Sequence, residues 1–208
     1  MNSINPGDVI WSGENPGIYL KDDERPQLPW GTLSLFFRIV LSPHGAGRAM
    51  LVLGAPDVVA GYPQVANFCI TDNLPMARYL ADEFVTQFGA FRNMPALQGM
   101  SWHTMTDCAT QTDGKTMHSE TLRAPGIEAS MNWHSLHAPF AADVAPAVSA
   151  TGAHQMYSVF RGADRGNVVV NGKPLPGRAV ERDFLGGRLS SAFLAFAESW
   201  VAPRKDQA

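Results

Sequence analysis

Short apolar runs alternate with turn-forming residues along most of this chain. Runs rich in β-branched and aromatic side chains occupy residues 33–41, 50–53 and 66–71, a composition typical of β-strands. Residues 154–161 and 167–170 have the same character, and the glycine-containing segment between them predicts a hairpin. The chain is therefore expected to be rich in antiparallel strands.

Two segments carry apolar residues at helical spacing instead. Residues 73–89 begin at a capping residue and predict a mid-chain helix with one apolar face. Residues 181–201 predict a C-terminal helix, although Gly186-Gly187 would each cost its first turn about 1 kcal/mol relative to alanine. The polar tail, residues 203–208, is expected to fray. The apolar positions of the C-terminal helix are Leu185, Leu189, Phe193, Phe196 and Trp200.

Residues 101–137 read as three antiparallel strands joined by two tight turns, Asp113-Gly114 and Pro125-Gly126. If each turn has two central residues, the first hairpin places Asp107 opposite Glu120. The second hairpin places Glu120 opposite Met131 and His118 opposite Trp133. Because side chains alternate across a strand, this register divides the stretch into two faces.

One of these faces contains the large apolar residues and is the expected inner face. The other face is mostly Thr, Ser and charge, as a solvated face should be. The inner face nevertheless includes carboxylates and imidazoles, which are rarely buried without partners. Its members are His103, Met105, Asp107, Ala109, His118, Glu120, Leu122, Ala129, Met131, Trp133 and His137.

Asp107, His118 and Glu120 are the candidate catalytic residues. Two opposed carboxylates cannot both ionise cheaply in a partly buried site, so one would keep a proton. With His118 two residues from Glu120, the group suits general acid–base chemistry. The candidate substrate-binding residues are His103, Met105, Leu122, Met131, Trp133, His137 and Arg161.

Two alternatives to this site stay open. A turn misjudged by one residue would move a whole strand to the opposite face and leave the carboxylates in solvent. The same residues, with His103 added, could instead bind a divalent metal, although their spacing matches no helical or zinc-ribbon pattern. No cofactor is expected for the acid–base site.

Composition excludes several classes of function. The net charge of −3 and the lack of a basic cluster argue against nucleic-acid binding. Apolar runs are too short for a membrane span, and no signal peptide, P-loop, dinucleotide fingerprint or nucleophile elbow is recognisable. Two cysteines, Cys69 and Cys108, are too few for a disulfide framework. We therefore expect a cytoplasmic protein with no nucleic-acid or membrane partner.

The whole pattern predicts a single domain, residues 1–208, of the α+β class and mainly antiparallel β. We expect a strongly bent sheet or barrel with the mid-chain and C-terminal helices added. In outline this arrangement resembles lipocalin-like (calycin) barrels, which implies a ligand pocket inside a run of hairpins. A helix-grip fold is the alternative, since a long C-terminal helix on an antiparallel sheet is typical of it.

The function predicted from these features is a cofactor-independent enzyme that moves a proton on a small apolar or aromatic molecule. A lyase, isomerase or decarboxylase would fit. The alternatives are a non-catalytic carrier or sensor of a small ligand, and a metal-dependent enzyme with His and carboxylate ligands. Exposed strand edges would also allow a homodimer.

Overall fold

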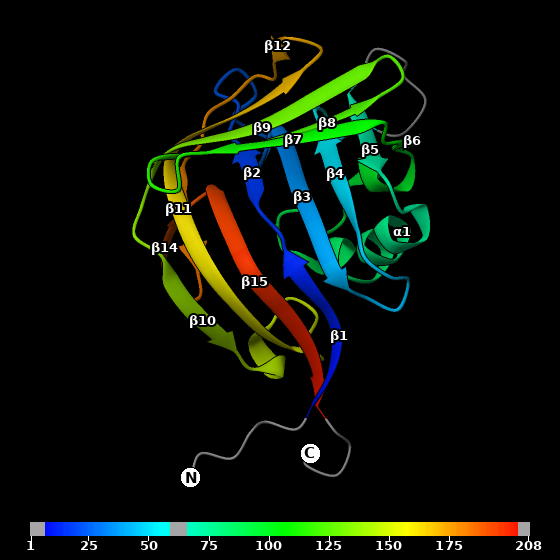
Figure 1. Ribbon diagram of the computed structural model, residues 1–208. Helices are drawn as coiled ribbons and strands as arrows, with labels where there is room; N and C mark the ends of the chain where they lie inside the picture. Colours follow the sequence, from blue (N-terminus) through cyan, green and yellow to red (C-terminus); the bar gives the residue numbers. More distant parts are fainter. Residues whose placement is uncertain (1–6, 59–65, 204–208) are drawn as a thin grey trace.

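The computed structural model describes residues 7–58 and 66–203, and these residues are mostly strand. One large mixed sheet dominates (Figure 1), with the strand order β6-β5-β4-β3-β1-β15-β11-β9-β8-β7. The strands of the first half are β1 (Gly7–Glu14), β2 (Gly17–Leu20), β3 (Thr32–Leu41), β4 (Gly47–Leu53), β5 (Asn67–Thr71) and β6 (Ser101–Thr104). Those that follow are β7 (Asp107–Thr112), β8 (Met117–Ala124), β9 (Ile127–Leu136), β10 (Phe140–Val144), β11 (Gln155–Val170) and β12 (Lys173–Pro174). The chain then forms β13 (Glu181–Phe184), β14 (Gly187–Ser190) and β15 (Ala192–Pro203).

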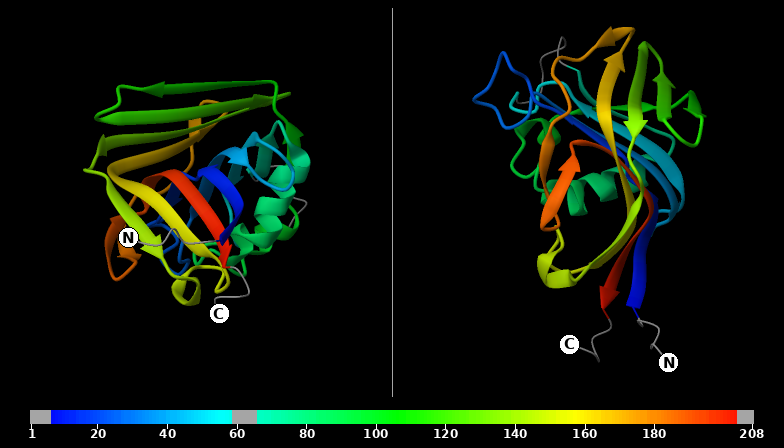
Figure 2. Two further views of the ribbon diagram at one scale, coloured as in Figure 1. Left: turned by 60° about the horizontal axis from the view of Figure 1, so that its bottom comes forward. Right: turned by 90° about the vertical axis from the view of Figure 1, so that its left-hand side faces the viewer.

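The sheet folds over itself into two layers (Figure 2). Strands β7, β8 and β9 form an upper layer that crosses a lower layer containing β2 to β5 and β15. Strand β11 belongs to both, because residues 155–162 pair with β15 and residues 163–170 pair with β9. The two layers are also joined between β6 and β7. There the backbone N–H of Met105 donates to the carbonyl of Thr71 in β5, and that of Thr106 donates to the carbonyl of Arg123 in β8. The result is a mainly antiparallel, strongly bent sheet, as expected, but not a clean barrel.

The predicted hairpin of residues 154–161 and 167–170 is wrong, since β11 runs through the whole segment. The glycines that suggested a turn lie at close contacts within a strand. A Cβ at Gly162 would lie 2.9 Å from the His137 ring, and one at Gly166 would lie 2.5 Å from the Ala192 Cβ. These glycines let other side chains approach the backbone of β11.

Two apolar cores lie on opposite faces of the lower layer. The upper core fills the space between the layers and includes Phe36, Met50 and Trp133, all fully buried. The lower core lies under the other face and includes Trp11 and Trp200. Since β3 and β4 are buried on both faces, they read as continuous apolar runs.

The mid-chain helix covers the lower core. Helix α1 (Leu74–Glu83) begins where predicted, with the Asn73 side chain accepting a hydrogen bond from the backbone N–H of Met76. It is shorter than predicted, because the chain passes at Phe84 into a 3₁₀ turn, η1 (Val85–Gln87). Two further 3₁₀ turns are η2 (Pro95–Gln98) and η3 (Pro146–Val148). No helix in the described ranges is long and apolar enough to cross a membrane.

The predicted C-terminal helix, residues 181–201, is wrong. This segment forms the β13–β14 hairpin and then β15. Leu185 and Gly186 have φ values of +50° and +77°, as in a type I′ turn, so Gly186 lies in the turn and Gly187 begins β14 rather than weakening a helix. Strand β15 is buried on both faces over most of its length, and apolar residues on both faces of a strand include some at helical spacing. Of the predicted tail, Pro203 ends β15 and residues 204–208 lie outside the described residues.

The central stretch, residues 101–137, contains one correct and one incorrect register. The second hairpin is as predicted, with His118 opposite Trp133 and Glu120 opposite Met131. In the first hairpin Thr112 pairs with His118 rather than Lys115, a displacement of three residues. The Asp113 carboxylate causes the longer loop, because it accepts hydrogen bonds from the backbone of Lys115, Thr116 and Met117. An odd displacement turns β7 over relative to β8.

Candidate functional site

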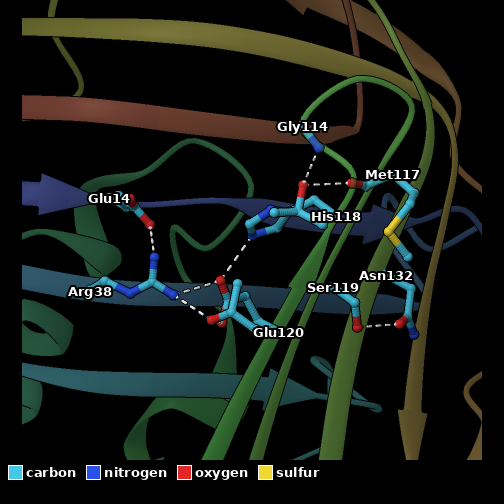
Figure 3. Close-up of polar contacts among 10 residues, drawn as sticks. Glu14, Arg38, Gly114, Met117, His118, Ser119, Glu120 and Asn132 are labelled. Carbon is cyan, nitrogen blue, oxygen red and sulfur yellow. Dashed lines mark hydrogen bonds and ion pairs between the residues drawn. The ribbon is translucent and has the colours of Figure 1, made fainter.

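Two of the predicted catalytic residues, His118 and Glu120, are buried and meet in a polar network between the layers (Figure 3), whose other members are partly buried or exposed. His118 Nε2 lies 2.9 Å from Glu120 Oε1, and Arg38 Nη2 from β3 lies 2.7 Å from the same oxygen. The Thr110 hydroxyl donates to Glu120 Oε2, and Arg38 also binds Glu14 at 2.7 Å. Both oxygens of Glu120 are therefore occupied, and the network ties β8 to β3 and β1. A catalytic role for the pair stays a prediction.

Asp107, the third predicted catalytic residue, is not part of this network. The changed register of β7 places it opposite Arg123, whose guanidinium lies 2.7 Å from its carboxylate. Its side chain is 61% exposed, so the expected Asp107–Glu120 pair is wrong. A surface ion pair of this kind contributes about 0–1 kcal/mol to the free energy of unfolding and does not indicate a functional site.

The predicted substrate-binding residues are dispersed. Leu122, Met131 and Trp133 are fully buried in the upper core, and Met105 packs beside them. His103 contacts Ser101 and Phe68 near one edge of the sheet. Exposed His137 pairs with Asp164. Arg161 donates to the carbonyls of His137, Gly114 and Lys115, so it fastens a loop to β11.

The structure does not bring together the residues of the predicted metal site. Within residues 7–58 and 66–203, no three or more His, Cys, Asp or Glu side chains are grouped closely enough to hold a metal ion. His103 lies on β6 at the edge of the lower layer, whereas His118 and Glu120 lie between the layers.

A cavity of about 280 Å³ lies on the opposite face of the lower layer, beside the lower core. Strand β13 and the turn that follows it form one wall, residues 144–150 form another, and β11 and β15 form the base. Its lining is mostly apolar and aromatic, with a few polar side chains. The polar members are Asn15, Tyr19, Ser149, Arg182 and Glu198, and the largest apolar ones are Phe88, Phe160, Phe184, Phe193 and Trp200.

A β-bulge points Glu198 toward this cavity. Tyr157 pairs with Ser199 and Val159 pairs with Phe196, so Ala197 and Glu198 together oppose one residue of β11. Ala197 has a φ of +49° at the bulge. The extra residue shifts the alternation of β15, so that Glu198 joins the face of Phe193 rather than the opposite face.

The Glu198 carboxyl is 3% exposed and has only neutral hydrogen-bond donors. Its Oε1 accepts from Trp200 Nε1 at 2.7 Å and from Asn15 Nδ2 at 3.2 Å. Burial raises the pKa of Glu198 to about 7, because these bonds and the Ser158 hydroxyl only partly offset the loss of water. Near neutral pH this carboxyl can therefore both give and take a proton.

Arg182 enters the cavity from β13 and is surrounded by aromatic rings. Its guanidinium carbon lies 5.3 Å from the ring centre of Tyr19, 4.9 Å from Phe184 and 5.1 Å from Phe193. Burial lowers the pKa of Arg182 from its ordinary high value, yet leaves it a cation. Burial likewise raises the pKa of Tyr19 to about 12, so its hydroxyl stays protonated. The cavity thus combines a fixed positive charge with a titratable acid.

Two buried polar atoms at this cavity have no hydrogen-bond partner among the described residues. They are Asn15 Oδ1, an acceptor, and Arg182 Nε, a donor. Buried polar atoms in native proteins are nearly always paired, and an orphan at a cavity indicates a missing ligand or water. Both side chains line the cavity, which makes it the best-supported binding site of the described part of the chain.

Asn15, Tyr19, Arg182 and Glu198 were not predicted from the sequence. Glu198 is the one charged residue of the apolar segment 192–201, and a buried strand there would have marked it as a buried acid. The helical interpretation of residues 181–201 concealed that signal. Arg182, Tyr19 and Asn15 meet Glu198 only through tertiary pairing, which no local pattern reveals.

Comparisons with known proteins give little further guidance. No family model matches the chain, and no curated protein matches it. A solved structure described as "Structural Studies of Acetoacetate Decarboxylase" has a TM-score of 0.38 and 12% sequence identity, and the alignment covers 96% of this chain and 88% of that one. At this level the likeness is too weak to transfer a residue or an activity.

Proposed function

We propose that this protein is an enzyme that moves a proton on a small, mainly apolar molecule bound in the cavity beside Glu198. One observation carries the proposal. A buried carboxyl whose hydrogen-bond partners are all neutral lines a mainly apolar cavity that also contains unpaired polar atoms. A perturbed acid in a concave, largely apolar site is a common arrangement for general acid–base catalysis.

Glu198 would act as the acid or the base. As a carboxylate it could remove a proton from a carbon next to a carbonyl, with the electron pair moving onto the carbonyl oxygen. If Glu198 then returned the proton to another carbon, the reaction would be an isomerisation. If a leaving group departed from the neighbouring carbon instead, the reaction would be that of a lyase. Trp200 and Asn15 would hold Oε1 in place while the apolar walls exclude water.

The site proposed here replaces the one expected from the sequence but keeps the same class of chemistry. The substrate is still small and apolar or aromatic, and a carboxyl still transfers the proton. The change of residue follows from the surroundings of Glu120. Both of its oxygens are bound by protein groups, whereas Glu198 lines an open volume.

The test begins with native mass spectrometry of the purified protein to identify a co-purified small molecule. Its C–H positions are then followed by NMR in heavy water, where an acid–base enzyme exchanges a proton for a deuteron. We expect Glu198→Gln to slow this exchange at least about 100-fold, as loss of a general acid or base does.

Glu120→Gln is the matched comparison, because it changes the carboxyl that the sequence predicted. We expect this variant, checked for fold by circular dichroism, to keep the exchange activity. Loss of exchange in Glu120→Gln but not in Glu198→Gln would show that the catalytic carboxyl is Glu120, in the upper core. Ligand binding with no exchange in any form would make the protein a carrier.

A further inference from the structure

Arg182 is a partly buried cation with no carboxylate paired with it among the described residues, and its Nε has no hydrogen-bond partner among them. Arg188, on the neighbouring strand of the same hairpin, shows the contrast. Its guanidinium lies 2.9 Å from Asp183 and 3.7 Å from Glu181. Burying an unpaired charge is expensive, and the aromatic rings around Arg182 offset only part of that cost.

We propose that Arg182 is the anion-binding residue of the cavity and that it selects small monocarboxylic acids with an apolar body. The proposal names a substrate class for the site described above and so rests on that proposed function. A guanidinium presents parallel N–H donors that match the two oxygens of a carboxylate. The aromatic rings that surround it would fix its plane for such a bidentate contact.

The remaining lining narrows the ligand further. Apolar and aromatic side chains form most of the walls, so the part of the ligand beyond its carboxylate should be apolar. The volume of about 280 Å³ lies near the lower end of ligand pockets, roughly 300–1,000 Å³, which limits the ligand to about the size of a single ring or a short branched chain.

The charge of the site favours a single negative charge over a double one. Arg182 is the one cation among the residues that line the cavity, and Glu198 is an acid in the same lining. A phosphate dianion would be repelled by an ionised Glu198 and would meet a single guanidinium. A monocarboxylate would neutralise Arg182 and leave Glu198 free to hold or release its proton.

Binding of three probes to the wild-type protein tests the selection directly. Benzoate and its neutral analogue benzamide are titrated by calorimetry at pH 6, where Glu198 is mostly protonated. Inorganic phosphate is added in a separate competition at pH 8, where phosphate is mostly a dianion and Glu198 is mostly ionised. We expect benzoate to bind about 10- to 100-fold more tightly than benzamide, the gain of a charge-assisted hydrogen-bonded pair. We expect phosphate not to displace benzoate. Equal binding of benzoate and benzamide, or no binding of either, would overturn the proposal.

Two arginine variants assign the effect to a residue. Arg182→Gln should abolish the preference for benzoate over benzamide, and Arg182→Lys, which keeps the charge without the bidentate fork, should retain part of it. Arg188→Gln on the same hairpin is the matched control and should leave the preference intact. A preference that survives in folded Arg182→Gln contradicts the assignment, and the wild-type comparison stands even if that variant does not fold.

These measurements need no turnover, which separates the two proposals. A benzoate preference that depends on Arg182, without any Glu198-dependent proton exchange, would support anion selection and refute catalysis. Exchange that depends on Glu198, with no preference for the carboxylate, would do the reverse.

Discussion

Glu198 and Glu120 are two deeply buried carboxyls whose surroundings differ at the level of single atoms. Glu120, 1% exposed, is held by Arg38, His118 and a threonine hydroxyl. Glu198, 3% exposed, has only neutral donors around it. A paired buried carboxylate holds elements together, whereas an unpaired one resists ionisation and keeps a proton available near neutral pH.

This difference has a consequence for stability. The folded-state pKa of Glu198, about 7, lies above the ordinary value of 4.5. The folded protein therefore binds the proton more tightly than the unfolded chain does. The stabilisation is fully present below about pH 4.5 and is lost as the pH rises through about 7.

We predict that wild-type stability, measured relative to Glu198→Gln, falls by about 3 kcal/mol between pH 4 and pH 8. Urea unfolding of both proteins at a series of pH values provides the measurement. Taking the difference between them cancels the titration of all other groups. A difference that does not change with pH would show that Glu198 ionises normally in the folded state.

At the scale of single residues, the sequence predicted burial correctly within the hairpin whose register was predicted correctly. The alternation of side chains and the Pro125-Gly126 turn were sufficient to predict that His118 and Glu120 are buried. They failed for Asp107, because the carboxylate of Asp113 builds a longer loop than its Asp-Gly dipeptide implies. The cavity residues were beyond reach, since a bulge and long-range strand pairing determine where they point.

At the scale of elements, β15 is the strand on which the cavity depends. It begins beside β2 and continues along β1 and β11, and its bulge allows residues from both of its halves to face the lower core. Phe193 and Ala195 precede the bulge, and Glu198 and Trp200 follow it on the same face. A helix would have placed Ala195 and Glu198 on the side opposite Phe193 and Trp200, so the local error in residues 181–201 was also an error about the site.

The bulge residue Ala197 offers a direct test. It has a φ of +49° and an exposed side chain, so glycine there would relieve backbone strain and lose little packing. We predict that Ala197→Gly raises the free energy of unfolding by about 1 kcal/mol. Ala195→Gly, a buried position in the regular part of β15, is the control and should lower it by about 1 kcal/mol. Denaturant midpoints measure both, and a loss in both variants alike would mean that the bulge is unstrained.

At the scale of the whole molecule, the lower layer is shared by two cores. The upper core is closed by β7, β8 and β9, and the lower core by α1 and the segments after it. The β-rich, antiparallel class was predictable from composition and turns. The two-layer arrangement was not, because it depends on β11 crossing between layers and on Met105 and Thr106 joining β5 to β8.

Sharing one sheet should make the two cores unfold together. Neither face of β3 and β4 can be exposed while the other stays packed, and the Arg38–Glu120 contact adds a polar link between the layers. We predict a single transition in which far-UV circular dichroism and tryptophan fluorescence coincide. Fluorescence reports on both cores, since Trp133 lies in the upper core and Trp11 and Trp200 lie in the lower core.

Cavity-forming substitutions, one in each core, make this prediction quantitative. Leu122→Ala in the upper core and Phe84→Ala in the lower core each remove a side chain that is at most 1% exposed. Each substitution should lower the free energy of unfolding by about 3–4 kcal/mol. The unfolding midpoints measured by circular dichroism and by fluorescence should shift by the same amount. Val40→Ala, at a position 70% exposed, should change stability by less than about 0.5 kcal/mol. A variant whose unfolding split into two transitions, or whose circular dichroism and fluorescence midpoints separated, would show that the layers unfold independently. The cavity beside Glu198 would then depend on the lower core alone.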